Sequence, residues 1–119
     1  MKVFIIGASH NPERYSYKAA QLLMAHGHEI VPLALKESTE GPFPILKAPK
    51  ESDQAEMITL YVGPKNQEDW IPKILSWNPR KVIFNPGTEN PAFQQQLTAA
   101  GIAWEDACTL VLLQTGQWG

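Results

Sequence analysis

Residues 2–24, KVFIIGASHNPERYSYKAAQLLM, contain the pattern that decides the fold. They begin with Val3-Phe4-Ile5-Ile6, an apolar run without polar alternation, which is typical of a strand buried on both faces of a parallel sheet. Small residues and an Asn-Pro pair then predict a loop from Gly7 to Ser16. Ser16 is the expected N-cap of a helix that continues through Met24. A strand, a small-residue loop and a helix N-terminus together predict an anion-binding site.

The predicted loop differs from the dinucleotide-binding fingerprint, which places three glycines in the pattern G-x-G-x-x-G. This loop has one glycine, Gly7, followed by Ala8 and Ser9, which are small enough for close backbone approach. The pattern therefore indicates a nucleotide or dinucleotide-like ligand held by its phosphates. The alternative is an ordinary strand-to-helix connection of an α/β protein.

The composition is that of a globular chain. Of its 119 residues, 44% are hydrophobic and 18% are charged, and we expect one domain spanning residues 1–119. A net charge of −2 gives no general attraction to nucleic acid or to an anionic membrane, and no apolar run approaches the ~20 residues that span a bilayer. A single cysteine, Cys108, excludes an internal disulfide framework. Because Met1-Lys2 leads directly into a strand, we expect no signal peptide and a cytoplasmic location.

The rest of the chain alternates further strands with helices. Residues 36–54 predict a long loop, with a short strand or a single turn near Ile45-Leu46. Strands are predicted at Ile30–Leu35, Met57–Val62, Lys81–Phe84 and Ile102–Glu105. A helix is predicted from Asn66 to Trp77, and Pro72 should either kink it or lie in the first turn of a helix that starts later. Another is predicted from Pro91 to Ala100 with Asn90 as N-cap, and Cys108–Leu113 is a short helix or an extended piece.

This order predicts an α/β, Rossmann-like fold, an open parallel sheet of about five strands in the order 3-2-1-4-5 with helices on both faces. In such sheets ligands bind beyond the carboxyl ends of the strands, where the winding reverses, which is here expected between strands 1 and 4. The loops at that place are Gly7–Ser16 and Asn85–Asn90, and both carry small and polar residues.

The end of the second strand distinguishes between classes of nucleotide. Dinucleotide cofactors usually need an acidic residue there to hold the ribose hydroxyls. This strand ends in Leu33-Ala34-Leu35-Lys36, and a lysine in that place argues against NAD and suits an extra phosphate. The alternative is that Lys36 is a solvated loop charge.

The same residues carry a resemblance to a known family. Gly7-Ala8-Ser9, Asn11-Pro12, Arg14 and Ser16-Tyr17 resemble the opening motif G-A-S-x-N-P-x-R-x-S-Y of the small CoA-binding domain proteins. These proteins are stand-alone relatives of the CoA-binding domain in the succinyl-CoA synthetase α subunit. The resemblance continues through residues 30–32, 84–90 and 107–110, and it covers nearly the whole chain.

The resemblance implies a Rossmann-like fold that holds CoA or acyl-CoA by its ADP and pyrophosphate portions. It implies that Gly7, Ala8 and Ser9 cradle the pyrophosphate, that Arg14, Ser16 and Tyr17 contact phosphate or ribose, and that Lys36 is the family's lysine after strand 2. The complete set of predicted binding residues is Gly7, Ala8, Ser9, Asn11, Arg14, Ser16, Tyr17, Leu33, Lys36, Pro64 and Gly87.

Two positions depart from the family pattern. Family members commonly have Asn-Pro before the lysine, where this chain has Ala34-Leu35, which puts the adenosine contacts there in doubt. They frequently have Gln-Gly after strand 4, where this chain has Pro86-Gly87, so the role of that glutamine does not transfer.

The predicted function is a CoA or acyl-CoA binding module without catalytic machinery of its own. We expect Arg14 to bind phosphate, Tyr17 either to contact the ligand or to pack at the helix start, His10 to be a solvated loop residue, and Cys108 to be inert. The histidines form no metal-binding spacing, and no nucleophile, base and orienting residue can be assembled.

Two other classes of function remain open. One is an NAD- or nucleotide-binding redox or sensor subunit that acts with a partner. The other is a scaffold protein with a vestigial pocket, in which Trp104 and Trp118 contribute an apolar patch. A homo-oligomer or a protein partner is compatible with either class.

Overall fold

β1 (Lys2–Ile6) is the first strand of a five-stranded, all-parallel sheet in the computed structural model, which describes residues 1–118. The other strands are β2 (Glu29–Leu33), β3 (Met57–Leu60), β4 (Lys81–Phe84) and β5 (Ala103–Asp106), and they lie in the order β2-β1-β3-β4-β5. The predicted fold class, an open Rossmann-like α/β sheet, is confirmed.

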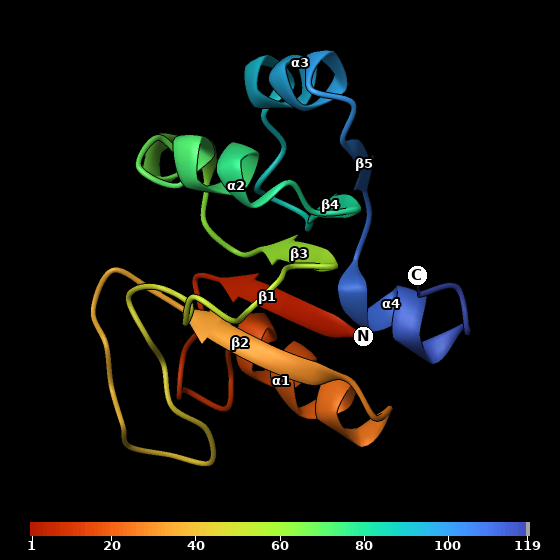
Figure 1. Cartoon of the computed structure of the whole chain (residues 1–119). Helices are drawn as coiled ribbons and strands as arrows, with labels where there is room; N and C mark the ends of the chain where they lie inside the picture. The colour runs from red at the N-terminus through yellow and green to blue at the C-terminus, as the bar shows by residue number, and fades with distance from the viewer. Residues whose placement is uncertain (119) are drawn as a thin grey trace.

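Helices cover both faces of the sheet (Figure 1). α1 (Tyr15–Ala25) and α4 (Thr109–Gln114) pack on one face, and α2 (Ile71–Trp77) and α3 (Pro91–Ala99) pack on the other. A short 3₁₀ helix, η1 (Pro64–Asn66), follows β3. Of the two alternatives for residues 108–113, a short helix or an extended piece, the structure has the helix, as α4.

Successive side chains of β1 point to opposite faces of the sheet, and helices cover both faces. Val3 and Ile5 pack with α1 and α4, whereas Phe4 and Ile6 pack with α2 and α3. All four side chains are fully inaccessible to solvent. The apolar run without polar alternation thus identified an interior parallel strand.

α1 buries one face at helical spacing. Ser16, Ala19, Ala20 and Leu23 are buried, and these positions follow the i, i+3, i+4, i+7 pattern of a helix that packs on a sheet. The prediction of Ser16 as N-cap was wrong: the helix begins at Tyr15, two residues earlier than predicted, and Arg14 has the extended backbone of the N-cap position. Because Ser16 belongs to the buried stripe, its side chain faces the core.

The position of the third predicted strand differs from the expected order. Residues 57–60 lie between β1 and β4 rather than outside β2. Leu46 makes a parallel bridge with Leu33 and occupies the place outside β2, so the chain crosses to the free side of β1 before the next strand forms. Pro32 fits this edge because its carbonyl accepts from the amide of Leu46 on the outer side, where the ring provides no donor.

The prolines and Asn90 position the starts of α2 and α3. Of the two alternatives for Pro72, the later-starting helix is the one observed: α2 begins at Ile71 rather than near Asn66, and Pro72 lies in its first turn, where a missing amide donor costs nothing. Asn90 caps α3 as predicted, because its Oδ1 accepts from the amide of Phe93 at 3.2 Å. Pro91 is then the first helical residue.

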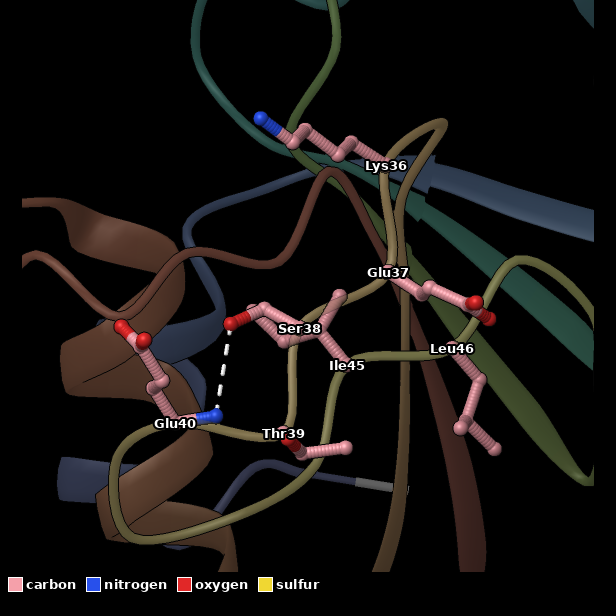
Figure 2. A pocket seen from close by; sticks show the side chains of 7 residues that line it. All are labelled: Lys36, Glu37, Ser38, Thr39, Glu40, Ile45 and Leu46. Atoms are coloured by element: carbon pink, nitrogen blue, oxygen red, sulfur yellow. Dashed lines mark hydrogen bonds between the residues drawn. The ribbon is translucent and has the colours of Figure 1, made fainter.

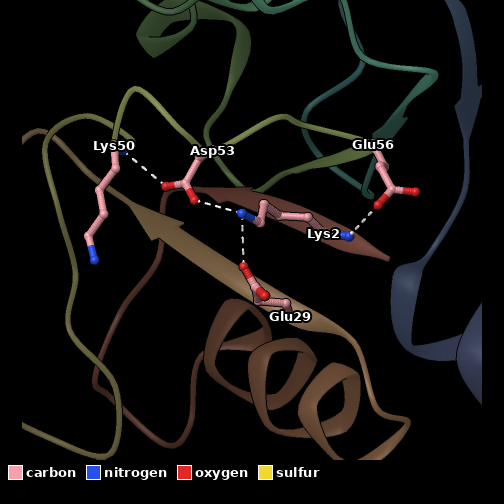
Figure 3. Close-up of polar contacts among 5 residues, drawn as sticks. All are labelled: Lys2, Glu29, Lys50, Asp53 and Glu56. Atoms are coloured by element: carbon pink, nitrogen blue, oxygen red, sulfur yellow. Dashed lines mark hydrogen bonds and ion pairs between the residues drawn. The ribbon is translucent and has the colours of Figure 1, made fainter.

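A polar cluster fastens the β2–β3 connection to the amino end of β1 (Figure 3). Lys2 Nζ lies 2.8 Å from Asp53 Oδ1 and 2.9 Å from Glu29 Oε2, and the Lys2 amide donates to Glu56 Oε1. Asp53 Oδ2 also accepts from the amide of Lys50. The hydrogen bond from Lys2 holds the pKa of Asp53 below its usual value, and the same contact raises the pKa of Lys2.

Candidate functional site

The candidate site lies at the carboxyl ends of the parallel strands, where the loops after β1, β2, β3 and β4 meet one edge of the sheet. Because β3 is the neighbour of β1, the winding reverses between these two strands. The expectation that residues 85–90 flank the reversal was therefore wrong: residues 61–63 follow β3 there, and residues 85–90 lie one strand further along.

The first part of the loop after β1 is bonded to β2. The amides of Gly7 and Ala8 donate to the carbonyl of Leu33 at 2.9 and 3.1 Å. Leu33 itself is fully buried, so its part in this loop is to accept these two hydrogen bonds. The amides of Gly7 and Ala8, which the resemblance assigns to the pyrophosphate, therefore donate to Leu33 instead. What stays a prediction is that the small size of Gly7 and Ala8 lets a ligand approach the backbone closely.

The second part of the loop is a series of local turns. Ser9 Oγ accepts from the amide of Asn11 at 3.0 Å, and Asn11 Oδ1 accepts from the amide of Glu13 at 3.0 Å. The Asn11 carbonyl accepts from the amide of Arg14. This is the turn chemistry expected of Ser and Asn, and it sets Arg14 at the start of α1 with an exposed side chain.

The N-terminus of α1 is open to an anion. Within residues 1–118 no side chain caps the helix, and no acidic residue occupies its first turn. Unpaired amides and the helix dipole favour a negatively charged group at such an end. Arg14 adds a positive charge at the same end, although the exposed Glu13 precedes it.

Ser16 and Tyr17, both predicted binding residues, serve packing in the structure. Ser16 is buried, at 4% exposure. The Tyr17 ring lies 5.8 Å from the Phe43 ring, and its hydroxyl oxygen accepts from Gln21 Nε2 at 3.2 Å. Of the two roles considered for Tyr17, packing at the helix start is the one that the contacts describe.

Lys36 lines an open cavity of about 670 Å³ next to β2 (Figure 2). In this view the side chains of Lys36 and Glu37 point to opposite sides of the chain. The cavity lining also includes the hydroxyls of Ser38 and Thr39 and the carboxylate of Glu40. Its complete lining is Lys36, Glu37, Ser38, Thr39, Glu40, Ile45 and Leu46.

His10 connects the loop after β1 to the segment that forms this cavity. Its Nε2 lies 2.6 Å from the Phe43 carbonyl, and its Nδ1 lies 3.4 Å from Ser38 Oγ. A carbonyl only accepts, so Nε2 carries the hydrogen and Nδ1 is the acceptor in the neutral ring. The expectation of a solvated histidine was wrong, because both ring nitrogens of His10 contact other loop residues. These partners are 28 and 33 residues away in sequence, so no local pattern reveals them.

Pro64 and Gly87 do not line the Lys36 cavity. Pro64 belongs to a separate groove of about 760 Å³ between α2 and α3, which also includes Lys65, Asn90 and Phe93. The Gly87 amide donates to Glu89 Oε1 at 2.8 Å, so Glu89 serves its local loop. A Cβ on Gly63 would be 3.9 Å from the Gly87 carbonyl, which places the starts of these two loops side by side.

Buried hydrogen bonds of Asn85 hold the ends of β3 and β4 to the start of α4. Its Nδ2 donates to Thr59 Oγ1 at 2.6 Å and to the Leu60 carbonyl at 2.8 Å, and its Oδ1 accepts from the Thr109 amide at 2.9 Å. The hydroxyls of Thr59 and Thr109 lie 2.8 Å apart. This network fixes the loop after β4 against β3 and α4.

Beside this network lies a second cavity that the sequence analysis did not find. It has a volume of about 260 Å³ and is lined by Tyr15, Tyr61, Asn85, Pro86, Cys108 and Leu110. Burial raises the pKa of Tyr61 to about 12. Three of its residues directly follow β3 or β4, and that position at a strand end is the signal that could have identified them.

The match to known proteins decides the family. The model of the family described as CoA binding domain matches residues 1–114. The chain belongs to the CoA-binding domain family. A crystal structure of an uncharacterized protein is 38% identical, with a TM-score of 0.92 over 98% of this chain and 97% of the other. Membership therefore agrees with the fold, and it supports CoA binding in general.

Two thermophile structures show that the fold is shared at low identity. Cell-free ID.343 from Thermus thermophilus is 20% identical, with a TM-score of 0.86 over 98% of this chain and 90% of the other. A conserved hypothetical protein from Pyrococcus furiosus is 22% identical, with a TM-score of 0.77 over 92% and 97%. No curated protein matches the sequence.

The described residues show neither a metal-binding cluster nor a membrane-spanning helix. Residues 1–118 contain no group of three or more His, Cys, Asp or Glu side chains placed to hold a metal ion. No helix in the same range combines the length and the apolar character that crossing a membrane requires.

Proposed function

We propose that this chain is a CoA or acyl-CoA binding module that holds the ADP and pyrophosphate portions at the carboxyl ends of its strands. The observation that carries the proposal is the uncapped N-terminus of α1 with Arg14 beside it, in a chain of the CoA-binding domain family. A pyrophosphate suits this place because both the helix dipole and the guanidinium favour a negative charge.

The residues present fit the other end of the nucleotide. CoA differs from NAD in carrying a phosphate on the adenosine ribose, and Lys36 lines the cavity next to β2 where that ribose lies in Rossmann-like folds. The ammonium group of Lys36 supplies a point charge for this phosphate. His10 supports the arrangement by fastening the cavity segment to the loop after β1.

The proposed module performs no reaction itself. Cys108 shares its cavity with Tyr15, Tyr61, Asn85, Pro86 and Leu110, and none of these side chains is a base that accepts a proton near neutral pH. Chemistry on a bound thioester would be supplied by a partner. A cytoplasmic location, where CoA thioesters are available, goes with this function. Incubation with acetyl-CoA tests the point: we expect no release of free thiol above the rate in buffer.

NAD binding is the second candidate, and one observation favours it. Glu37 and Glu40 line the same cavity as Lys36, so a carboxylate is available for ribose hydroxyls even though strand β2 does not end in one. A substitution pair separates the candidates. If CoA is the ligand, Lys36→Ala should weaken CoA binding and Glu37→Gln should leave it unchanged. If instead Glu37→Gln weakens NAD binding and Lys36→Ala leaves NAD binding unchanged, the second candidate is supported.

Calorimetric titration with CoA, dephospho-CoA, NAD and ADP tests the proposed function. We expect CoA to bind most tightly, dephospho-CoA and ADP to bind more weakly, and NAD to give no saturable heat. Saturable NAD binding without a response to CoA would reject the proposal. The scaffold alternative predicts no binding of any of the four; Trp104 and Trp118 give it little support, because both rings pack against the core.

A further inference from the structure

Two cavities of different chemistry lie on opposite sides of the loop after β1. The Lys36 cavity follows β2, and the smaller cavity of about 260 Å³ lies at the ends of β3 and β4. β1 separates them in the sheet order β2-β1-β3-β4-β5. A ligand that passes over the N-terminus of α1 can therefore reach one cavity with each end.

The smaller cavity is mainly apolar. The rings of Tyr15 and Tyr61, Pro86 and the Leu110 side chain supply most of its wall, together with the Cys108 thiol. The amide of Asn85 is already bonded to Thr59, Leu60 and Thr109, so it offers the cavity no free N–H donor.

No residue in the lining of this cavity carries a charge. A carboxylate placed there would lose its hydration without gaining a cation, which is unfavourable. The Tyr61 hydroxyl is neutral at physiological pH, as an ordinary tyrosine is, and burial raises its pKa further, to about 12. The cavity therefore selects for an uncharged group.

We propose that the cavity formed by Tyr15, Tyr61, Asn85, Pro86, Cys108 and Leu110 binds the acyl group of a CoA thioester, and that it prefers a short, uncharged acyl chain. This inference rests on the proposed function, because CoA itself places the thioester. Tyr15 is the first residue of α1 and follows Arg14, and Pro86 precedes Gly87, so the cavity adjoins the proposed phosphate site along the chain. The nucleotide end then lies toward Lys36 and the thioester end toward Leu110.

The volume limits the length of the chain. A water molecule occupies about 30 Å³ in the liquid, so a cavity of about 260 Å³ holds on the order of nine non-hydrogen atoms. The thioester and the adjoining part of the pantetheine take some of this space. An acyl chain of about four to six carbons fills the remainder.

Calorimetric titration with a series of thioesters tests the inference. The series is free CoA, acetyl-, butyryl-, hexanoyl-, decanoyl- and succinyl-CoA. We expect affinity to rise by about two- to fourfold per methylene up to hexanoyl-CoA, because each buried methylene contributes that much, and to rise no further for decanoyl-CoA. Succinyl-CoA, which has the same number of carbons as butyryl-CoA but ends in a carboxylate in place of the methyl group, should bind at least about tenfold more weakly than butyryl-CoA.

A substitution that fills the cavity should remove the preference. Leu110→Trp is expected to abolish the difference between butyryl-CoA and CoA. Val111→Trp is the matched control, because Val111 is the next residue of α4, is 50% exposed and does not line the cavity. If Leu110→Trp does not fold by circular dichroism, Tyr15→Ala is the second variant: it removes part of the cavity wall and should reduce the difference between butyryl-CoA and CoA, and because Tyr15 is 67% exposed its removal leaves the core intact.

The outcomes separate this inference from the proposed function. CoA binding with equal affinity for all the thioesters, or succinyl-CoA binding as tightly as butyryl-CoA, would overturn the acyl cavity and leave the CoA module standing. Absence of binding by every member of the series would overturn both.

Discussion

Gly7 lies directly against the backbone of Tyr61. A Cβ on Gly7 would be 3.1 Å from both the carbonyl carbon and the carbonyl oxygen of Tyr61, and 2.8 Å from Cγ1 of Val62. Gly7 also has φ +90°, a conformation that other residues rarely adopt. The end of β1 can therefore turn toward α1 beside the end of β3 only because this position has no side chain.

Gly7→Ala should destabilise the fold by about 2–5 kcal/mol, the sum of backbone strain and of overpacking against β3. Gly27→Ala is the matched control, since Gly27 has φ +84° but nothing within 4 Å of the added Cβ. It should cost only about 1–2 kcal/mol, for strain alone. Urea unfolding measures both free energies, and equal losses would show that the contact with Tyr61 and Val62 is unimportant.

Asn85→Leu should lower the free energy of unfolding by about 3 kcal/mol, because it leaves the buried amide of Thr109 and the hydroxyl of Thr59 without this partner. Thermal unfolding followed by circular dichroism measures the change. Asn66→Ala, at an exposed position of η1, serves as the control and should change stability by less than about 0.5 kcal/mol. A loss below about 1 kcal/mol for Asn85→Leu would contradict the role given to the network.

The Lys2–Asp53 pair predicts a loss of stability in acid. Asp53 has a lowered pKa in the folded chain, so it stabilises the fold above its unfolded pKa, near 3.8, and that contribution is lost as the pH falls through the lower folded value. Urea unfolding between pH 6 and pH 2.5 should therefore show a steeper decline below about pH 4 for the wild type than for Asp53→Asn. Asp69→Asn, at an exposed site, should follow the wild-type curve. Parallel curves for the wild type and Asp53→Asn would argue against the pair.

Lys36→Ala should reduce the affinity for CoA by about tenfold or more, because a hydrogen bond to a charged phosphate is lost. The affinity for dephospho-CoA, which lacks that phosphate, should hardly change. Lys65→Ala provides the control, since Lys65 is an exposed lysine that lines the groove between α2 and α3. Equal losses for CoA and dephospho-CoA would show that Lys36 does not read the phosphate on the ribose.

Much of the fold could be predicted from local patterns. The apolar run at residues 3–6, the capping residue Asn90 and the position of Pro72 each depend on short-range chemistry, and the structure agrees with all three. The place of β3 could not be predicted, because it depends on where residues 34–56 run. The bridge of Leu46 to Leu33 fills the position outside β2, and no periodicity in that segment indicates it.

The candidate site divides in the same way. The loop after β1 and the α1 N-terminus follow from residues that are adjacent in sequence. His10, Asn85 and Tyr61 acquire their positions from contacts between different loops, with hydrogen-bond partners of His10 and Asn85 more than 20 residues away. The predictions for Leu33 and Ser16 as ligand contacts did not anticipate that both side chains are buried.

A titration of ¹⁵N-labelled protein with CoA, followed by backbone amide shifts, tests the central claim most directly. We predict saturable shifts of Ser9 and Asn11 in the loop after β1, of Arg14 and Tyr15 at the start of α1, and of Lys36 and Gly87. Shifts confined to the groove between α2 and α3, or no shifts at millimolar CoA, would contradict the account.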